Sequence, residues 1–322
     1  MLKISISVEG WQGLTWPRWK RLITEVEHIG LAGLFLSDHF NTSGTPNANS
    51  LELVVALAYL ADHTESIHFG SMVSPLSFRD PVFLARQAAA INDLSEGRMI
   101  LGLGAGWNEF EHTMFGYELG DVPTRMERLD EGLAVITGLL RHNEPFSYAG
   151  RFYHLRDAVL AGPRRAGSPL IMVGGSGPKR TLPLVARYAD IWNAQLVSPD
   201  EFRQRSDLLD RLLGEVGRQP DEVKRTITLP LFCGRTEVEL AQRGHWLRSL
   251  NPQWVDVPIE TIFASLRPNF KSLITGSPEE VIQQIRNYAQ AGVTELVIQW
   301  GDMDDIEGLI LLSEQVLPHL AE

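Results

Sequence analysis

The sequence contains a single cysteine, Cys233, so an internal disulfide framework is excluded. It also lacks long apolar runs: none approaches the roughly 18 residues that a membrane helix needs. The opening residues MLKISISVEG lack the apolar core of a signal peptide. These absences predict a cytoplasmic protein that does not span a membrane.

Positive charge is scarce as well. The chain has 29 Lys and Arg residues against 40 Asp and Glu residues, which gives a formal net charge of −11. Binding to nucleic acid or to an anionic membrane needs a basic surface. The charge balance therefore argues against both partners and leaves a small-molecule substrate as the expectation.

The chain itself is that of an ordinary globular protein. It has 322 residues, of which 44% are hydrophobic and 21% charged. A chain of this length buries roughly 75% of its unfolded surface, so its core is large enough without disulfides or metals. We expect one domain over residues 1–322, because no stretch is rich enough in Gly, Pro or Ser to act as a linker.

Short β-branched runs alternate with longer segments of helical periodicity along the whole chain. The predicted strands are 3–8, 32–40, 66–75, 98–106, 169–175, 190–196, 226–234 and 294–300. The predicted helices are 16–30, 50–64, 80–97, 122–141, 177–190, 198–217, 277–292 and 304–320. Eight strand–helix units favour a closed (β/α)8 barrel, a TIM barrel, and an open doubly wound sheet is the alternative.

Two segments depart from this rhythm. Residues 144–155 carry aromatics on both sides of Ala149-Gly150, which indicates a β-hairpin insertion. Residues 235–272 have mixed patterns and are interpreted as a second insertion. Together with residues 41–49, these insertions are the expected walls of a substrate pocket.

The active site of such a barrel lies at the carboxyl ends of the strands. His39 follows the second strand, where a neutral imidazole could donate or accept a proton near pH 7. A hydrogen-bonded loop histidine without a catalytic role is the alternative. Asp38 could orient the imidazole, but neighbouring residues of a strand point to opposite faces, which argues against direct pairing.

Glycines gather at two other strand ends. Gly174, Gly175 and Gly177 surround Ser176, and Lys179 and Arg180 follow, which suggests an anion cradle before a helix. A tight turn alone is the alternative. The GLGAG run at 102–106 is not a dinucleotide fingerprint, because its spacing is GxGxG. We expect it to admit a flat ligand, with a strand-terminal bulge as the alternative.

The sequence contains no motif for a metal site or for a serine nucleophile. The sequence has no HExxH and no paired Cys/His spacing, so no metal site is predicted. Ser176 lacks the GxSxG frame of a nucleophile elbow. Trp11 follows the first strand and could line the pocket.

The strand-end residues resemble the bacterial luciferase-like superfamily of flavin and deazaflavin enzymes over essentially the whole chain. The motifs that carry the resemblance are SDHF at 37–40, SP at 74–75, RDP at 79–81, EGRMILGLGAGWNEFEHTMFG at 96–116 and MVGGSGPKRTLPLVARYADIWN at 172–193. GAGWNE followed by EH is more similar to the branch that uses coenzyme F420, a 5-deazaflavin. Relatives that bind FMN share much of the glycine pattern and keep FMN as the alternative cofactor.

The resemblance implies a tricyclic ring at the barrel mouth, with its back on a bulge of the third strand. That bulge contains a non-proline cis peptide, which aligns here with Ser71–Met72. His39 and Glu109 are the implied proton-transfer residues. The implied cofactor-binding residues are Asp38, Ser71, Met72, Ala105, Gly106, Trp107, Asn108, Gly174, Gly175, Ser176, Trp192 and Asn193.

The resemblance therefore implies an F420-dependent oxidoreductase that transfers hydride between the deazaflavin C5 and a small organic substrate. One alternative is an FMN-dependent monooxygenase, which would need a separate flavin reductase. A second is a flavin-binding barrel without turnover. A homodimer is possible on the same resemblance.

Overall fold

The computed structural model describes residues 2–41, 49–162, 166–250, 252–269 and 272–320. Over these residues eight parallel strands close into a barrel, and each strand pairs with the next in chain order until β12 returns to β1. The strands are β1 (Lys3–Val8), β2 (Gly33–Leu36), β3 (His68–Ser71), β5 (Met99–Gly104), β8 (Leu170–Gly174), β9 (Ile191–Gln195), β10 (Lys224–Cys233) and β12 (Glu295–Gln299). The predicted TIM barrel is confirmed, and the open sheet is excluded.

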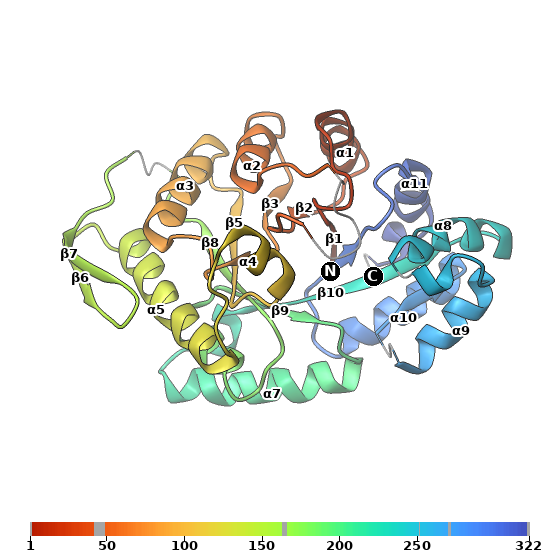
Figure 1. Ribbon diagram of the computed structural model, residues 1–322. Coiled ribbons are helices and arrows are strands. Elements are labelled where there is room, and N and C mark those ends of the chain that lie inside the picture. Colours follow the sequence, from red (N-terminus) through yellow and green to blue (C-terminus); the bar gives the residue numbers. More distant parts are fainter. Residues whose placement is uncertain (1, 42–48, 163–165, 251, 270–271, 321–322) are drawn as a thin grey trace.

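Helices surround the strands on the outside of the barrel (Figure 1). They are α1 (Trp16–His28), α2 (Leu53–Asp62), α3 (Pro81–Leu94), α5 (Val122–Arg141), α6 (Thr181–Tyr188), α7 (Pro199–Glu215), α10 (Pro278–Gln290) and α11 (Ile306–Gln315). Local sequence fixes where several begin. Ser198 and Ser277 each accept a hydrogen bond from the backbone of a glutamate three residues later, and that glutamate bonds back to the serine N–H.

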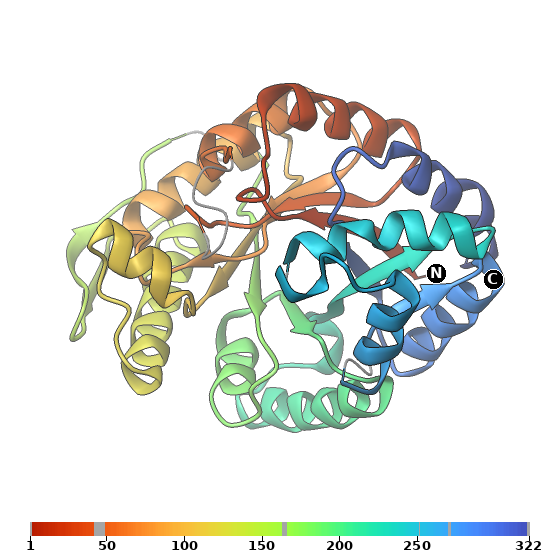
Figure 2. The ribbon, with the colours of Figure 1, turned by 45° about the vertical axis from the view of Figure 1, so that its right-hand side comes forward.

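Further elements interrupt the eight units. They are β4 (Ser74–Pro75), α4 (Glu109–Phe115), the hairpin β6 (Phe146–Ala149) and β7 (His154–Ala158), η1 (Pro220–Glu222), α8 (Glu237–Leu250), η2 (Pro252–Trp254), α9 (Ile259–Asn269), β11 (Ile274–Gly276) and η3 (Leu317–Leu320). The hairpin stands where the sequence predicts one. Among the described residues of the segment 235–272, α8 and α9 pack against each other, and α8 packs against β10 (Figure 2).

The hairpin is fastened to α5 rather than to the barrel mouth. The buried carboxylate of Glu131 in α5 accepts backbone hydrogen bonds from Arg151 at 2.7 Å, Phe152 at 2.8 Å and Tyr153 at 3.2 Å. Three donors satisfy a carboxylate that burial would otherwise penalise. The hairpin is thereby held on the outer side of the barrel.

The barrel interior is packed in layers that alternate along the strands. Its middle layer is apolar and consists of Phe35, Ile100, Met172, Ile191 and Val297. Below it, at the amino ends of the strands, the side chains of Ser5, His68 and Glu295 form a polar cluster. Above it, the cavity described below opens at the carboxyl ends. No helix of the described part of the chain is both long and apolar enough to cross a membrane.

Candidate active site

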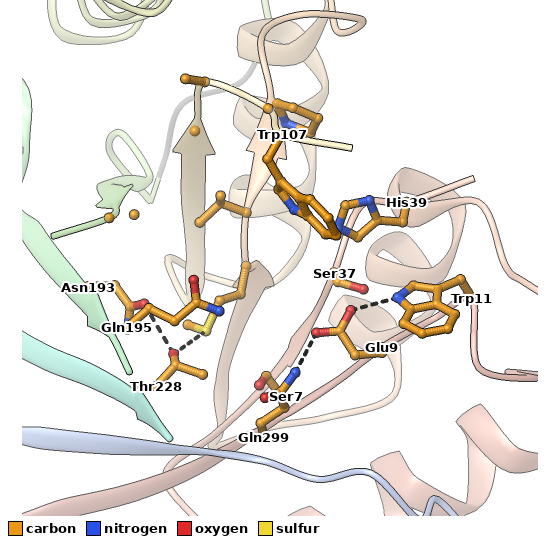
Figure 3. A pocket seen from close by; sticks show the side chains of 18 of the residues that line it. Ser7, Glu9, Trp11, Ser37, His39, Trp107, Asn193, Gln195, Thr228 and Gln299 are labelled. Carbon is orange, nitrogen blue, oxygen red and sulfur yellow. Dashed lines mark hydrogen bonds between the residues drawn. The ribbon is translucent and has the colours of Figure 1, made fainter. Parts of the chain in front are cut away.

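A cavity of about 420 Å³ opens at the carboxyl ends of the barrel strands. This position and size are typical of small-molecule sites in barrels of this kind. Strand ends from the whole circumference contribute to it (Figure 3). The lining residues are Ser7, Glu9, Trp11, Ser37, His39, Met72, Val73, Pro75, Gly104, Ala105, Gly106, Trp107, Glu111, Gly174, Gly175, Asn193, Gln195, Thr228 and Gln299.

A bulge between β3 and β4 forms one wall of the cavity. The peptide bond Met72–Val73 is cis, one bond after the Ser71–Met72 bond that the sequence predicts. Ser71 is buried behind this wall and lies outside the cavity; its hydroxyl donates to the Gly102 carbonyl at 2.8 Å and accepts from the Gly102 N–H at 3.0 Å. The predicted bulge is therefore present, and Met72 and Val73 are the residues that it exposes to the cavity.

The glycines of β5 and β8 make room for this bulge. A Cβ atom added to Gly104 would lie 2.6 Å from Val73 Cγ2, and one added to Gly174 would lie 3.0 Å from Val73 Cγ1. A Cβ on Gly102 would meet the Ser71 carbonyl oxygen. Gly102 and Gly104 of the GLGAG run therefore leave room for the bulge, whereas a Cβ on Gly106 would meet Ser77 and Pro75. Contact of these glycines with a flat ligand stays a prediction, and the Val73 side chain is part of the surface that such a ligand would meet.

Two other glycines adopt backbone conformations that side chains disfavour. Gly106 has φ of 80° and Gly175 has φ of 122°. Both line the cavity, Gly106 after β5 and Gly175 after β8. The Gly175 N–H donates to the Asn193 carbonyl at 2.9 Å, so this amide is already satisfied and does not serve as an anion donor.

His39 faces the cavity and is held by a carboxylate that the sequence analysis did not identify. His39 Nδ1 lies 2.8 Å from Glu111 Oε1, and the other oxygen of Glu111 accepts from the Phe40 N–H at 3.0 Å. The Glu111 side chain is 1% exposed, and that of His39 is 14% exposed. With Nδ1 engaged, Nε2 is the ring nitrogen available for exchange with a ligand.

The pKa of His39 is raised above its ordinary value of 6.5. Burial lowers the pKa of the imidazole, but the hydrogen bond to Glu111 and its negative charge outweigh burial. Glu9 and Asp38 add smaller contributions in the same direction. The imidazolium form is thus stabilised inside the cavity.

Asp38 lies outside the cavity, on the opposite face of its strand from His39. Its carboxylate accepts two hydrogen bonds from Arg79, at 2.8 Å from Nε and 2.6 Å from Nη2. This bidentate pair joins the end of β2 to the segment before α3. Asp38 therefore pairs with Arg79 and not with His39, in agreement with strand alternation, and its contact with a cofactor stays a prediction.

Glu109 and Asn108 also lie outside the cavity. Glu109 is exposed at the first position of α4 and faces a separate depression together with Arg125. Asn108 is buried, and its amide donates to the Asn41 carbonyl at 2.9 Å. The sequence predicts Glu109 as a proton-transfer residue, whereas the structure brings Glu111 to His39. The two glutamates are two positions apart in α4, about 200° around the helix axis, so they lie on opposite faces.

Of the predicted site residues at the ends of β8 and β9, some face the cavity and others lie outside it. Trp192 is fully buried against Phe202 of α7, outside the barrel, and its indole N–H donates to the Gly175 carbonyl at 2.8 Å. Ser176 lies outside the cavity, and its hydroxyl accepts from the Gln195 N–H at 3.1 Å. Asn193 does line the cavity, with Oδ1 3.1 Å from Thr228 Oγ1. Strand alternation explains why Asn193 faces inward and Trp192 outward.

The end of β1 contributes a polar group that the sequence analysis did not single out. Glu9 Oε2 accepts from the Trp11 indole N–H at 3.0 Å, and Glu9 Oε1 accepts from Gln299 Nε2 at 3.0 Å (Figure 3). The alternation of Ser5, Ser7 and Glu9 along β1 was an available signal for an inward carboxylate. Trp11 lines the cavity, which agrees with its position in the sequence after the first strand.

Trp107 covers the edge of the cavity. Its side chain is 67% exposed, and its ring meets that of His39 edge-on, with the centroids 5.6 Å apart. An exposed tryptophan over a cavity can cover a planar ligand. Of the expected walls, residues 42–48 lie outside the described residues. The hairpin and the segment 235–272 contribute no described residue to the cavity lining.

Chemically, the cavity combines an apolar wall with a titratable pair. Met72, Val73, Ala105 and Trp107 present apolar surface to a planar ligand, and the pair His39–Glu111 can hold or release a proton beside it. No cysteine or metal cluster is part of the described lining. Such a site suits a bound organic cofactor that carries out the electron transfer itself.

Comparison with known proteins agrees with this geometry. A family model described as luciferase-like monooxygenase matches residues 3–295. The F420-dependent glucose-6-phosphate dehydrogenase of Microbacterium testaceum (strain StLB037) is 26% identical over 307 residues, which cover 91% of this chain and 90% of that protein. The 4-hydroxyprotoasukamycin monooxygenase of Streptomyces nodosus subsp. asukaensis is 25% identical over 316 residues, covering 91% of this chain and 82% of that protein.

Solved structures share the whole fold. An F420-dependent secondary alcohol dehydrogenase in complex with an F420–acetone adduct superimposes with a TM-score of 0.83 at 20% sequence identity. The match covers 100% of this chain and 99% of that chain.

Proposed function

The chain belongs to the luciferase-like monooxygenase family, and we propose that it is an F420-dependent oxidoreductase acting on a small organic substrate. The observation that carries this proposal is the position of the His39–Glu111 pair on a cavity wall beside the Met72–Val73 bulge. Relatives whose names specify F420 match over nine-tenths of the chain, which favours the deazaflavin over FMN.

The residues of the cavity fit a planar ring. The bulge at Met72 and Val73 would contact one face of the ring, and Ala105 and Gly106 leave space along its edge. When bound, F420 supplies the hydride donor or acceptor at C5. The protein then has to orient the substrate, cover it and manage one proton.

The phosphate of the cofactor would lie at the carboxyl end of β8. Ser176 and Gly177 follow β8. The exposed Lys179 and Arg180 lie in the turn that connects Gly177 to the first residue of α6. A helix amino terminus and two cations favour an anion at this position. Gly174 and Gly175 shape this approach by lacking side chains, while Ser176 braces it through Gln195.

His39 is the proposed proton-transfer residue. When an alcohol is oxidised, the hydroxyl proton passes to His39 Nε2 as the hydride leaves the carbon; in the reverse direction, the imidazolium returns that proton to the carbonyl oxygen. Glu111 keeps the ring in one orientation and stabilises its charged form. Glu111 is thus a positioning residue.

Titration of the apo protein with F420 and, separately, with FMN tests this function through the fluorescence of each cofactor. We expect tight binding of F420 and weak binding of FMN. Micromolar binding of FMN without a response to F420 would favour a monooxygenase supplied by a separate flavin reductase. Binding of a cofactor without electron transfer to any of a panel of alcohols and ketones would favour a barrel without turnover.

A further inference from the structure

We infer that the substrate end of the cavity selects uncharged or positively charged substrates and rejects anionic ones, with Glu9 as the residue that sets this preference. The inference rests on the proposed function, because it concerns the substrate of the same site. The inference concerns only the charge of the substrate, so it can be wrong even if the protein depends on F420.

The charged groups that line the cavity among the described residues are Glu9, Glu111 and His39. No lysine or arginine belongs to this lining. Two carboxylates and one imidazolium leave one net negative charge even when His39 is protonated. When His39 is neutral, the imbalance is larger, so an anionic substrate meets repulsion in both states of the reaction.

Glu9 is fixed in place without being neutralised. Its two oxygens accept hydrogen bonds from Trp11 Nε1 and from Gln299 Nε2, each at 3.0 Å. Both donors are uncharged, so they orient the carboxylate but leave its negative charge uncompensated. A carboxylate held in this way can accept a hydrogen bond from a substrate hydroxyl or ammonium group.

The barrel order places this carboxylate at the substrate end. β1 and β8 are separated by three strands on one side, β2, β3 and β5, and by three on the other, β9, β10 and β12. Glu9 at the end of β1 therefore faces Gly174 and Gly175 across the mouth. The phosphate tether proposed for β8 and the carboxylate of β1 occupy opposite ends of the cavity, and His39 of the neighbouring β2 lies on the side of Glu9 (Figure 3).

The nearby described cations are committed elsewhere. Arg79 pairs with Asp38 and, through Nη1, with Glu52 at 2.9 Å. Arg125 donates to the Gly106 carbonyl at 3.1 Å from the outer side and lines the separate depression beside Glu109. The segment TSGTPNA at 42–48, which lies outside the described residues, contains no lysine or arginine. A phosphate or carboxylate on the substrate would find no countercharge among these groups.

This charge pattern does not fit a phosphorylated substrate. A glucose-6-phosphate dehydrogenase has to bind a phosphate dianion on its substrate, and arginine or lysine is the usual partner for such a group. The described lining has neither. The substrate class that fits is a neutral or amine-bearing secondary alcohol, or the corresponding ketone.

The test uses three alcohols of similar size that differ in charge: 2-propanol, 1-amino-2-propanol and lactate. Each is added to the protein loaded with F420, and reduction of the cofactor is followed together with the fluorescence change of bound F420. We expect the neutral and cationic alcohols to bind or react at least about tenfold better than lactate, as a single uncompensated charge at short range allows. Glucose and glucose 6-phosphate form a second pair with the same expected order.

Variants connect the preference to Glu9. Glu9→Gln keeps the size of the side chain and removes its charge, so it should narrow the discrimination against lactate while the affinity for F420 stays unchanged. Glu215→Gln, which removes an equal charge from the exposed end of α7, should leave the discrimination as it is. If both variants narrow the discrimination against lactate equally, the net charge of the protein, and not Glu9, sets the preference.

Several outcomes overturn the inference. The inference is wrong if the protein accepts lactate as well as 2-propanol, or glucose 6-phosphate as well as glucose. Reduction of F420 in the same assay would still support the proposed function. A loaded protein that responds to none of the compounds would also count against the inference. Failure to bind F420 at all would reject the proposed function itself, and the titration with F420 alone identifies that case.

Discussion

Glu111 Oε1 lies 2.8 Å from His39 Nδ1, although 72 positions separate the two residues in the chain. His39 follows β2, and Glu111 lies in the first turn of α4 after β5. Because β3 stands between those strands, the pair forms only once β2, β3 and β5 lie side by side. The contact is therefore a product of tertiary structure, and it provides the first prediction.

Replacement of Glu111 by Gln should move the pH profile of alcohol oxidation to lower pH. The oxidation needs neutral His39, so kcat/KM of the wild type should rise with pH through a midpoint above 6.5, the ordinary pKa of histidine. Burial lowers this pKa and Glu111 raises it, so the variant loses the dominant raising contribution. We expect the midpoint to move to lower pH, as measured from initial rates at a series of pH values. An unchanged midpoint would show that Glu111 does not set the pKa of His39.

His39→Ala should separate chemistry from binding. We expect turnover to fall by about 10²–10⁴-fold, the usual contribution of a general acid or base. Affinity for F420 should stay within a few-fold, because the bulge and the β8 end remain intact. Titration by fluorescence and initial rates give the two values. Turnover within twofold of the wild type would remove His39 from the mechanism.

Sequence periodicity located the barrel well because its signals are local. Most of the eight strands are short segments rich in apolar or β-branched residues, and the predicted helix 122–141 coincides with α5. The sequence does not predict helix α4, because the helix has only seven residues and its N-cap, Asn108, makes no capping hydrogen bond with its side chain. A helix that short has little intrinsic stability and depends on packing.

The site was predicted less completely because its contacts are tertiary. The resemblance and the strand ends predict His39, Met72, Ala105 and Gly175 as site residues, and the structure places all four on the lining of one cavity. Strict alternation along β1 and β9 would have added Glu9 and removed Trp192. The pairing of His39 with Glu111, and not with Glu109, depends on which face of α4 turns inward. No local pattern specifies that rotation.

Gly104→Ala tests whether the β5 glycines exist for the bulge. The new Cβ would lie 2.6 Å from Val73 Cγ2, so Val73 has to move. We expect a loss of about 1–3 kcal/mol in the free energy of unfolding and weaker F420 binding. Gly214→Ala in α7 is the matched control, because its Cβ would meet no atom within 4 Å. That change should be neutral or stabilise by about 0.5–1 kcal/mol.

A double-mutant cycle tests whether the contact with Val73 causes the loss of stability in Gly104→Ala. Adding Val73→Ala to Gly104→Ala should recover part of the lost stability, since the overlapping methyl groups are removed. Urea denaturation gives the four free energies. Strictly additive losses would indicate that the alanine conflicts with some other group.

Lys179 and Arg180 test the position of the cofactor phosphate. Both are exposed in the turn before α6, so replacing both by Ala should leave stability nearly unchanged. Affinity for F420 should fall about tenfold and lose part of its dependence on salt, whereas the deazaflavin–ribitol core without the phosphate should bind as before. Arg156→Ala on the exposed hairpin is the control. Equal losses for both ligands would place the phosphate elsewhere.

The polar cluster at the amino ends of the strands makes stability depend on pH. Glu295 Oε1 lies 2.7 Å from His68 Nε2 and 2.5 Å from the Ser5 hydroxyl, and its side chain is 9% exposed. Burial raises the pKa of Glu295, but the hydrogen bond and charge of His68, with help from Ser5 and Lys3, lower it below its ordinary 4.5. A lowered carboxylate pKa contributes stability above the unfolded-state pKa, and that contribution is lost as pH falls through the folded-state pKa.

Glu295→Gln should therefore cost about 3 kcal/mol of unfolding free energy near neutral pH. The cost should shrink as pH falls below about 4.5, because the wild-type carboxylate then becomes protonated and loses the same interaction. Denaturation at a series of pH values measures it, with the exposed Glu215→Gln, expected within about 0.5 kcal/mol of the wild type, as the control. Catalysis at the opposite end of the barrel should change little. A penalty that stays constant across the series would mean that shape, rather than charge, holds Glu295 beside His68.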